Sequence, residues 1–184
     1  MDQAEIDRLN DILRPVEPPR VIEGVYSEDQ HQRIVDVIKD NGPWPTITAH
    51  HFETVEELMA TSNGGMPENF NLTLDDIATA HFRGFLGENS VPFYPELEDC
   101  FYNSRFLDLA RDYWGAQYAK PTMMLFNLCG PHHSGLSAHL DAVTFRGIRI
   151  ENSPVWLQNV MGRSGLFTEH LVKMAQVITW WYLG

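Results

Sequence analysis

Cysteine, basic residues and long apolar runs are all scarce in this sequence. The only cysteines are Cys100 and Cys129, which match no zinc-binding or Cys-x-x-Cys spacing, so we expect both thiols to stay reduced. No apolar stretch approaches the roughly 20 residues that a membrane-spanning helix needs. Residues 1–6 are acidic and lack an apolar run, so we expect no signal peptide. These absences predict a cytoplasmic protein without a membrane partner.

The shortage of basic residues also limits the partners. The chain has 13 Lys and Arg against 25 Asp and Glu, which gives a formal net charge of −12. A phosphate backbone would be repelled by such a surface, so we expect no nucleic-acid partner. No Gly-x-Ser-x-Gly elbow is present, and the Gly-x-x-Gly spacing at 162–165 lacks the lysine and the strand-loop-helix frame of a phosphate-binding loop.

What the chain does contain is typical of a folded domain. Its 184 residues are 43% hydrophobic and 21% charged, and the 10 Phe, 5 Trp and 6 Tyr argue against disorder. This length suits one domain with a real core. We predict a single domain over 1–184, mainly helical over about 1–120 and mainly β over about 121–184.

Capping signals and hydrophobic spacing predict several helices. Ser27 and Gln30 form a capping box ahead of a helix that places Ile34, Val35 and Ile38 inward and ends at Asn41-Gly42. Other helices are expected over 4–13, after Thr54, over 74–78, from Ser104 to Gly115, and over 166–175. Residues 84–95 and 152–164 are predicted to be loop, because the first is rich in Gly and Pro and the second has little periodicity.

Strands are expected over 21–26, 122–128, 136–150 with a break near Gly147, and 176–183. We expect Phe145, Trp156, Trp180 and Trp181 to lie in the core. A strand over 176–183 would expose a sticky edge. This edge predicts either that the natural chain continues or that a partner chain, such as a second copy, covers it.

The most informative pair is His139-x-Asp141. On an extended backbone, residues two apart point to the same face, so an imidazole nitrogen and a carboxylate oxygen would converge on one point. Such a pair suits a divalent metal with open positions, as in the two-His-one-carboxylate site of non-haem Fe(II) oxygenases. The alternative is a histidine hydrogen-bonded to a carboxylate on a surface hairpin.

The order of these features resembles the Fe(II)/2-oxoglutarate-dependent oxygenases. A helical N-terminal part, the strand that contains Met124–Asn127, a loop and then Ser137–Asp141 follow one another as in that family. The resemblance implies an α+β fold with a double-stranded β-helix (jelly roll) core and N-terminal helices packed outside. It also implies Fe(II) held by His139 and Asp141, with 2-oxoglutarate and O2 as co-substrates. The implied reaction is hydroxylation of a small molecule, with 2-oxoglutarate converted to succinate and CO2.

Other roles follow from the same resemblance. Asn127 would contact 2-oxoglutarate, and Arg146 could clamp a carboxylate through a bidentate pair, with Arg149 on the opposite strand face. The family also has a second histidine ligand several strands after the aspartate. The only histidine after Asp141 is His170, whose place in the expected helix over 166–175 does not suit a ligand. We therefore expect that this chain lacks the C-terminal part of the fold.

Two other functions fit the same residues. The chain could be a non-catalytic binding or assembly module on this scaffold, pairing with another subunit through its C-terminal strand. It could also be a cupin-like metal enzyme without 2-oxoglutarate, although the His-x-His pair of cupin sites is absent. A strand with a later histidine and arginine would favour the oxygenase.

Overall fold

The computed structural model describes residues 3–4, 7, 20–46, 49, 52–63, 73, 82–128, 144–148 and 153–180. Helices and a small antiparallel sheet occur together in them, which confirms the α+β class. No described helix is long and apolar enough to cross a membrane. The elements in chain order are α2 (Glu28–Asp40), α4 (Val55–Asn63), β1 (Phe82–Glu88), β2 (Val91–Pro92), η1 (Pro95–Leu97), α6 (Glu98–Phe101), α7 (Ser104–Trp114), β3 (Met123–Leu128), α8 (Val155–Ser164) and η3 (Thr168–His170).

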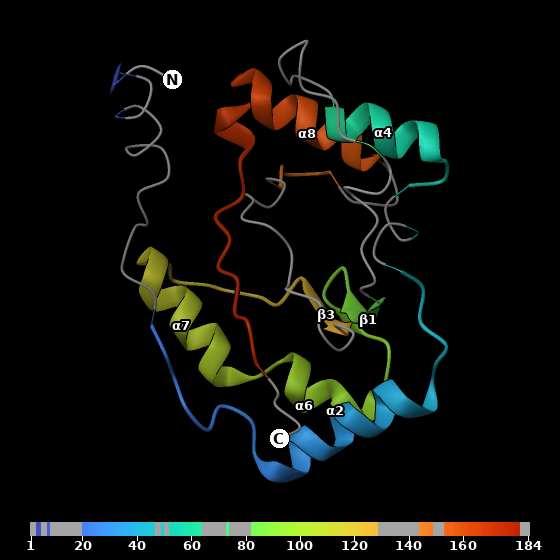
Figure 1. Cartoon of the computed structure of the whole chain (residues 1–184). Coiled ribbons are helices and arrows are strands. Elements are labelled where there is room, and N and C mark those ends of the chain that lie inside the picture. The colour runs from blue at the N-terminus through green and yellow to red at the C-terminus, as the bar shows by residue number, and fades with distance from the viewer. Residues whose placement is uncertain are drawn as a thin grey trace.

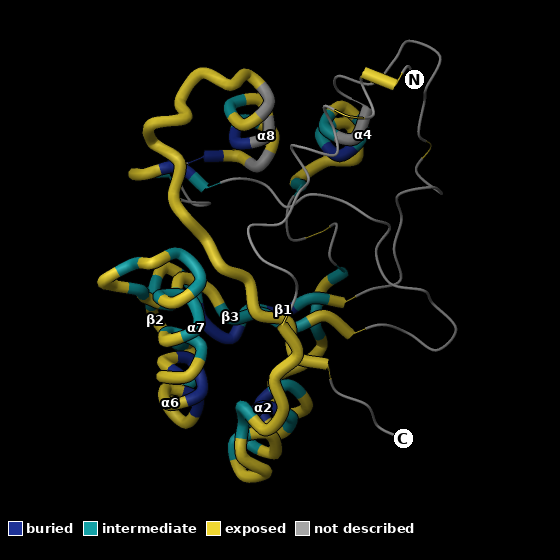
Figure 2. The backbone as a smooth tube through the Cα atoms, turned by 90° about the vertical axis from the view of Figure 1, so that its left-hand side faces the viewer, coloured by how far each residue is buried: buried dark blue, intermediate teal, exposed yellow. Residues whose placement is uncertain are grey.

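The sheet lies between two groups of helices. Its strand order is β2-β1-β3, and β1 pairs antiparallel with both neighbours. Figures 1 and 2 show α2 and α6 on one side of the sheet, and α4 and α8 on the other. After η3 the chain runs from the α8 end of the molecule towards the end that holds α2 and α6 (Figure 1).

Helix α2 begins as the sequence predicts. Ser27 accepts from the backbone N–H of Gln30, and the Gln30 side chain accepts from the backbone N–H of Ser27, so the capping box is formed. The helix ends at Asp40 with Asn41 as its cap. Ile34 is buried as expected, but Val37 is the second buried residue, whereas Val35 is only half-buried.

The core forms where α2 packs on the sheet. Ile34 and Val37 of α2 meet Leu86 of β1 in this core. Leu97 of η1 and Cys100 of α6 complete the cluster. Half-buried Met124 and Phe126 of β3 pack against this cluster. Burying side chains of this size stabilises the fold by roughly 1.5–3 kcal/mol each. The face of the sheet that carries Leu86 and Phe126 is therefore the one turned towards α2.

The prediction of loop over 84–95 was wrong, because two glycines there belong to strand β1. Gly84 lies under the rings of Trp44 and Phe126, and a Cβ on it would come within 2.4 Å of Trp44 Cε3 and 2.5 Å of Phe126 Cε1. Gly87 is similarly covered by Phe101, at 2.6 Å from the position of a Cβ. These glycines therefore permit close approach of rings to backbone rather than a break in the strand.

Trp44 joins α2 to the sheet across this close contact. Its indole Nε1 donates to the carbonyl of Ile38 near the end of α2 (2.7 Å). Its ring meets that of Phe126 edge to face, with centroids 4.8 Å apart. The backbone next to it, Pro45–Thr46, bridges to the start of β1, where Arg83 N–H donates to the Pro45 carbonyl (3.0 Å).

The predicted strand over 21–26 was wrong. Its carbonyl groups accept hydrogen bonds from side chains of the α7 region, with Arg105 donating to Gly24 (2.7 Å) and Asn103 to Val25 (3.5 Å). Gly24 also has φ of +62°, outside the strand region. The α7 helix itself is confirmed: it runs from Ser104 to Trp114, and Gly115 ends it in the left-handed conformation.

The α4 helix also forms where the sequence predicts a helix after Thr54. The Thr54 hydroxyl accepts from the backbone N–H of Glu57 (3.1 Å), as a capping residue should. The Glu57 carboxylate accepts from the backbone N–H of Glu53 (3.2 Å) at the same end of the helix. Strand β3 is confirmed as well, although its residues are half-buried or exposed rather than buried.

Two predictions for the last third were wrong. Residues predicted as loop over 152–164 form α8, which has Pro154 as its N-cap and ends at Gly165 with φ of +66°. The predicted helix over 166–175 is reduced to the short turn η3. There Leu171 bridges to Phe145, and the backbone N–H of Val172 donates to the Thr144 carbonyl (2.9 Å). This tertiary pairing overrides the local helical spacing.

Residues 172–180 contain no strand, so the described part of the predicted strand over 176–183 was wrong, while 181–183, which include Trp181, lie outside the described residues. Residues 172–180 are extended and largely exposed, and the Trp114 indole holds them by donating to the Met174 carbonyl (2.9 Å). The residues expected in the core differ in their burial. Phe145 is buried at 3% exposure, but Trp156 is 44% exposed and Trp180 is 76% exposed, so those two predictions were wrong.

The described residues show only three strands, in one sheet. A jelly roll has about eight strands in two sheets, and no such arrangement is present within the ranges given above. The predicted helices over 4–13 and 74–78 and most of the predicted strand over 136–150 lie outside those ranges, and the described part of that strand, 144–148, is a single bridge at Phe145 followed by a turn. β1 and β2 fall in the part predicted to be helical, and α8 in the part predicted to be β.

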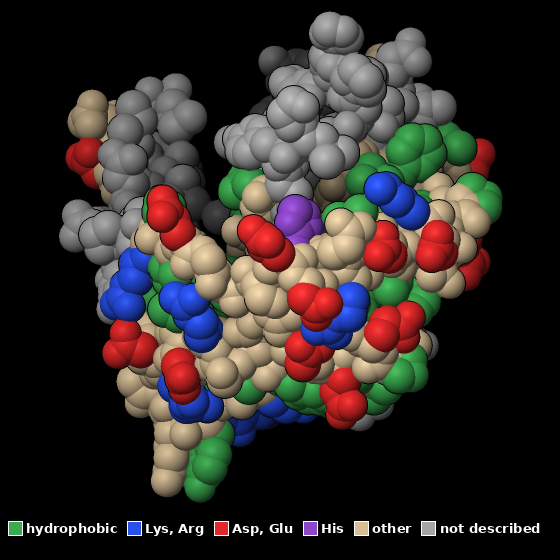
Figure 3. All heavy atoms as spheres, turned by 90° about the horizontal axis from the view of Figure 1, so that it is seen from below, with side chains coloured by type: hydrophobic (Ala, Val, Ile, Leu, Met, Phe, Trp, Pro, Cys, Tyr) green, Lys and Arg blue, Asp and Glu red, His purple; other side chains and the backbone are tan. Residues whose placement is uncertain are grey.

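The surface around α2 mixes both signs of charge. Figure 3 shows Lys and Arg side chains interspersed with Asp and Glu on the face seen from below. Arg33 of α2 illustrates this pattern, since it lies between Asp29 and Asp99. On this face the described residues carry no continuous basic patch.

The close packing over β1 gives a first prediction. Gly84→Ala should lower the free energy of unfolding by about 1–3 kcal/mol, because the new methyl group forces the Trp44 and Phe126 rings to move. Gly42→Ala is the matched control, since its Cβ would meet Trp44 at 3.6 Å, an ordinary contact. Urea unfolding of both variants measures the difference. Equal stability of the two would show that the rings do not press on β1.

Candidate functional site

The proposed metal pair lies in a segment that the structure does not describe. His139 and Asp141 are outside the described residues, and so are His50, His51, His81, His132, His133, Cys129 and Arg149. Among the described residues, no group of three or more His, Cys, Asp or Glu side chains could hold a metal ion. The metal site therefore stays a prediction, and the described residues on either side of it supply the geometry.

Asn127 is the last residue but one of β3, the strand that precedes that segment. It sits opposite Arg83 in the β1–β3 ladder, and Arg83 Nε donates to Asn127 Oδ1 at 2.8 Å. Since side chains alternate along a strand, the pair projects from the face opposite Gly84 and Phe126, away from α2. β1 starts and β3 ends next to this pair. Asn127 therefore lies just before the segment of the sequence that contains the His-x-Asp motif.

Sequence reasoning missed Arg83. Residues 84–95 read as loop because of their glycines, so the residue just before them had no strand to belong to. A signal was present: Phe82, Gly84 and Leu86 alternate with Arg83 and Phe85 as on a strand with one polar position. The pairing with Asn127 spans 44 residues and has no local signature.

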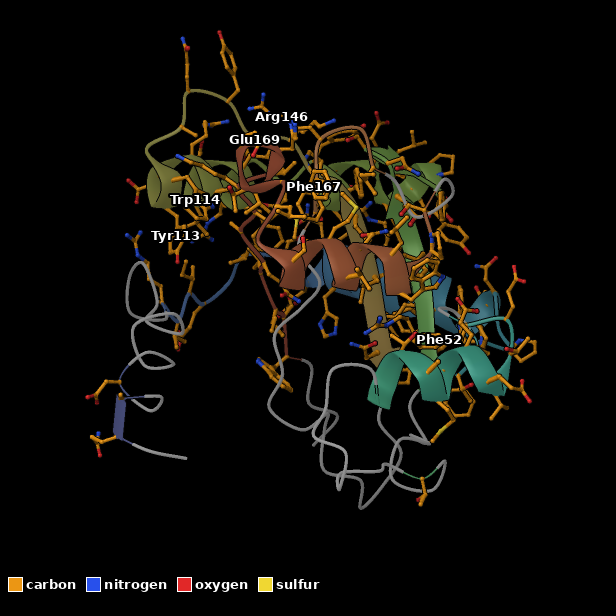
Figure 4. All side chains as sticks on the ribbon, turned by 90° about the horizontal axis from the view of Figure 1, so that it is seen from above. Phe52, Tyr113, Trp114, Arg146, Phe167 and Glu169 are labelled. Carbon is orange, nitrogen blue, oxygen red and sulfur yellow. The ribbon has the colours of Figure 1, made fainter. Side chains whose placement is uncertain are left out.

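Arg146, the other predicted co-substrate contact, lies elsewhere. Its backbone N–H donates to the His170 carbonyl (2.8 Å), and its side chain is exposed in the turn after Phe145. Figure 4 shows Arg146 near Glu169 and Phe167, on the side of the molecule that carries Trp114 and far from Phe52. The hydrogen bond of Asn127 comes from Arg83, not from Arg146.

His170 ends the turn η3 rather than lying in a helix. Its imidazole is 55% exposed and lies 3.4 Å from the Glu169 carboxylate. The bridge between Phe145 and Leu171 brings its backbone next to Arg146, five positions after Asp141 in sequence. Among the described residues, the acidic group beside its side chain is the Glu169 carboxylate.

One small pocket lies beside this bridge. Phe145, Phe167 and Leu171 line it together with residues of α8, and the Phe145 and Phe167 rings meet edge to face at 6.4 Å. Its volume of about 40 Å³ leaves room for only a few water molecules. The pocket is therefore a packing gap under α8 and too small for a substrate.

The strongest electrostatic cluster joins α2 to α6. Arg33 Nη1 and Nη2 donate to the two carboxylate oxygens of Asp99, each at 2.8 Å, and Gln30 Nε2 adds a third bond at 2.8 Å. The hydrogen bonds from Arg33, and then that from Gln30, hold the pKa of the Asp99 carboxyl well below its usual range. The same pair raises the pKa of Arg33. This bidentate pair fastens α2 to α6 beside the core.

Two further groups beside this cluster have raised pKa values because they are buried. Burial raises the pKa of the Tyr26 hydroxyl, with smaller contributions from Cys100 and Asp99. Burial also raises the pKa of the Cys100 thiol to about 11, and nearby Asp99 adds to the effect. Cys100 is free and 1% exposed. A neutral, enclosed thiol is a packing residue and a poor nucleophile.

No protein-family description, no curated protein sequence and no solved structure matches this chain.

The Arg33–Asp99 pair predicts how stability depends on pH. Because the pKa of Asp99 is lower in the folded than in the unfolded chain, its contribution is fully present well above the unfolded value near 3.9 and declines as pH falls below it. Asp99→Asn should therefore destabilise the protein at pH 7, with a difference that shrinks towards pH 3. Urea unfolding at both pH values tests this.

Arg33→Gln provides the control for that experiment. If the two side chains act as a pair, the double variant should be little less stable than either single variant at pH 7. Fully additive losses, or a difference between Asp99→Asn and the unsubstituted protein that stays constant down to pH 3, would contradict this account.

The enclosed thiol gives a third prediction. In a Cys129→Ser background, Cys100 of the folded protein should react with a disulfide reagent at pH 8 more than about 100-fold more slowly than in urea, since it is buried and largely protonated. Absorbance of the released thiolate follows the reaction. Labelling of the native protein at the unfolded rate would show that the α2–α6 contact opens freely.

Proposed function

We propose that this protein is a non-haem Fe(II)/2-oxoglutarate-dependent oxygenase that hydroxylates a small molecule. His139 and Asp141 would supply two protein ligands to the iron. When bound, iron and 2-oxoglutarate would supply oxygen activation, in which 2-oxoglutarate and O2 give succinate and CO2 and one oxygen atom enters the substrate. The chain's own task is to fix the ligands, bind the acid and exclude water.

One observation carries the proposal beyond the motif. Asn127 lies one residue before the end of β3, the strand that precedes His139-x-Asp141, and it accepts a hydrogen bond from the guanidinium of Arg83. An amide and a guanidinium are donors that suit the carboxylate of an oxo acid. Such donors, one on β1 and one on β3, the strand before the metal pair, fit a co-substrate that reaches from the metal to the sheet. The donor set therefore agrees with 2-oxoglutarate, and the jelly roll around it belongs to the same proposal.

The alternative of a non-catalytic assembly module also has an observation in its favour. Residues 172–180 expose apolar side chains, with Val177 46%, Ile178 62% and Trp180 76% exposed. An extended apolar segment of this kind can add to the sheet edge of another subunit, including a second copy of this chain. In that case His139 and Asp141 would be an ordinary hydrogen-bonded pair.

Metal binding distinguishes the two functions. Mn(II), a spectroscopic substitute for Fe(II), should bind the protein, and His139→Ala or Asp141→Asn should weaken binding by more than about 100-fold, since outer-shell changes alone cost 10–100-fold. His170→Ala is the matched control and should bind as the unsubstituted protein does, because that imidazole is 55% exposed. Electron paramagnetic resonance of free Mn(II) measures all four.

The second measurement adds Fe(II) and 2-oxoglutarate without O2, followed by exposure to air. We expect a weak visible charge-transfer band before air and succinate after it. A protein that binds no metal, forms no succinate and elutes as a dimer that Trp180→Ser dissociates would instead be the assembly module.

A further inference from the structure

Residues 172–180 form a surface segment that the described fold holds near its beginning. The backbone there is bonded to Thr144, and the Trp114 indole donates to the Met174 carbonyl (2.9 Å). Over 175–180, the part of the chain that the structure describes supplies no hydrogen-bond partner for the backbone. Figures 1 and 2 show this segment running from the α8 end towards α2 without joining the sheet. It therefore presents a row of exposed peptide groups.

The side chains of this segment are those of a strand rather than of a solvated tail. Val177, Ile178 and Thr179 are β-branched and Trp180 is aromatic, and these residue types are enriched in strands. Ile178 and Trp180 are each more than half exposed, and Val177 is nearly half exposed although its neighbour Ile178 lies on the other face. Apolar side chains on both faces of an unpaired backbone are the features of a strand edge on which another chain adds.

The charge of the segment decides which partner fits it. The whole chain has a formal net charge of −12, so two copies repel each other over most of their surface. Over 170–184, however, the sequence has no Asp or Glu, and Lys173 is its one Lys or Arg. Two copies can therefore meet here without carboxylates facing each other. Because a basic partner would be drawn to the acidic residues elsewhere, a second copy of this chain is the occupant that the segment favours.

The hydrogen bond to the Met174 carbonyl also sets which peptide groups point outward. In a strand, the backbone groups of successive residues point to alternate edges. Since the Met174 carbonyl points to α7, the backbone groups of Ala175, Val177 and Thr179 point away from it. Antiparallel pairing about a two-fold axis at Val177 joins the two Val177 residues by two bonds, and joins Ala175 of each copy to Thr179 of the other. In this register Met174 lies opposite Trp180, which gives a sulfur–ring contact.

We propose that residues 175–180 pair antiparallel with the same residues of a second copy, so that the protein forms a two-fold symmetric dimer. This interface is separate from the proposed metal site, so the inference goes beyond the proposed function and holds with or without iron. The other edge of the segment faces α7, so pairing ends with two copies. Each copy contributes roughly 500 Å², less than the ~800 Å² of a standard interface, so the dimer is weak, with a dissociation constant on the order of 100 µM.

Sedimentation equilibrium of the full chain, from about 1 µM to about 1 mM, measures the dimer and brackets this constant. Thr179→Pro removes an outward N–H without removing an apolar side chain, and should weaken the dimer by more than about 10-fold, since two bonds are lost across the two-fold axis. Gln176→Pro is the matched control: its N–H points to α7, so dimerisation should change by less than about 3-fold. Melting temperatures establish that both variants are folded.

A disulfide tests the register directly. The two-fold axis places the Cα atoms of the two Val177 residues about 5.5 Å apart, within the range of a disulfide. In a Cys129→Ser background, Val177→Cys should therefore form a covalent dimer under mild oxidation, and Cys100 does not compete because it is 1% exposed. Ala175→Cys is the matched control, since Ala175 lies opposite Thr179 and not opposite itself. It should cross-link more than about 10-fold more slowly.

The inference and the proposed function fail separately. A protein that stays monomeric at about 1 mM overturns the dimer even where Mn(II) binds, and slow amide exchange over 175–180 in that monomer would place the segment on its own chain. Equal losses in Thr179→Pro and Gln176→Pro, or assemblies larger than two, would mean unspecific apolar contact and also overturn it. A dimer that follows the expected order but binds no Mn(II) upholds the interface and leaves the oxygenase rejected.

Discussion

The contact between aromatic rings and the bare backbone of β1 is the constraint on which the described fold depends. Trp44 and Phe126 lie on Gly84, and Phe101 lies on Gly87, at distances that leave no room for a side chain. Trp44 at the same time binds the end of α2 through its indole N–H. The helix, the loop after it and two strands are thus fixed to one another at a single place, and Leu86 is enclosed between them at 1% exposure.

This arrangement decides on which face of the sheet Arg83 and Asn127 lie. With Gly84 and Phe126 turned towards α2, their neighbours Arg83 and Asn127 must project to the other side, since a strand alternates its faces. The irregularity between Phe85 and Gly87 lets β1 keep Leu86 in the core without turning Arg83 over. A polar pair on the face turned away from α2 is therefore a direct consequence of tight packing on the face turned towards it.

Elements with local signals could be predicted from the sequence. The capping box at Ser27 and Gln30, the cap at Thr54 and the glycine after Trp114 each act within a few residues, and the structure has helices there. The glycines in 84–95 predicted a loop, but the structure uses Gly84 for close packing under Trp44, which is far away in sequence. The helix predicted over 166–175 failed for the same reason. The apolar residues have helical spacing, but Leu171 pairs with Phe145, which is distant in sequence.

The residues of the candidate site also differ in whether a local sequence signal identifies them. Asn127 could be predicted because it sits on the strand before the His-x-Asp motif, whereas Arg83 is recognised only once the register of β1 and β3 is known. His139 and Asp141 lie outside the described residues, so the structure neither supports nor contradicts their role. The His-x-Asp motif indicates metal chemistry, and the pairing of β1 with β3 places Arg83 beside Asn127.

Within the described residues, the stretch after η3 is held at few points. Backbone bonds of Arg146 and Val172 hold its beginning, and the Trp114 indole holds Met174 across 60 residues of sequence, with Lys173 over the ring at 5.5 Å. Segments with so few contacts open at low free-energy cost, well before the core. Amide protons over 175–180 should accordingly exchange with solvent far sooner than those of α2, so the molecule contains two levels of protection rather than one cooperative whole.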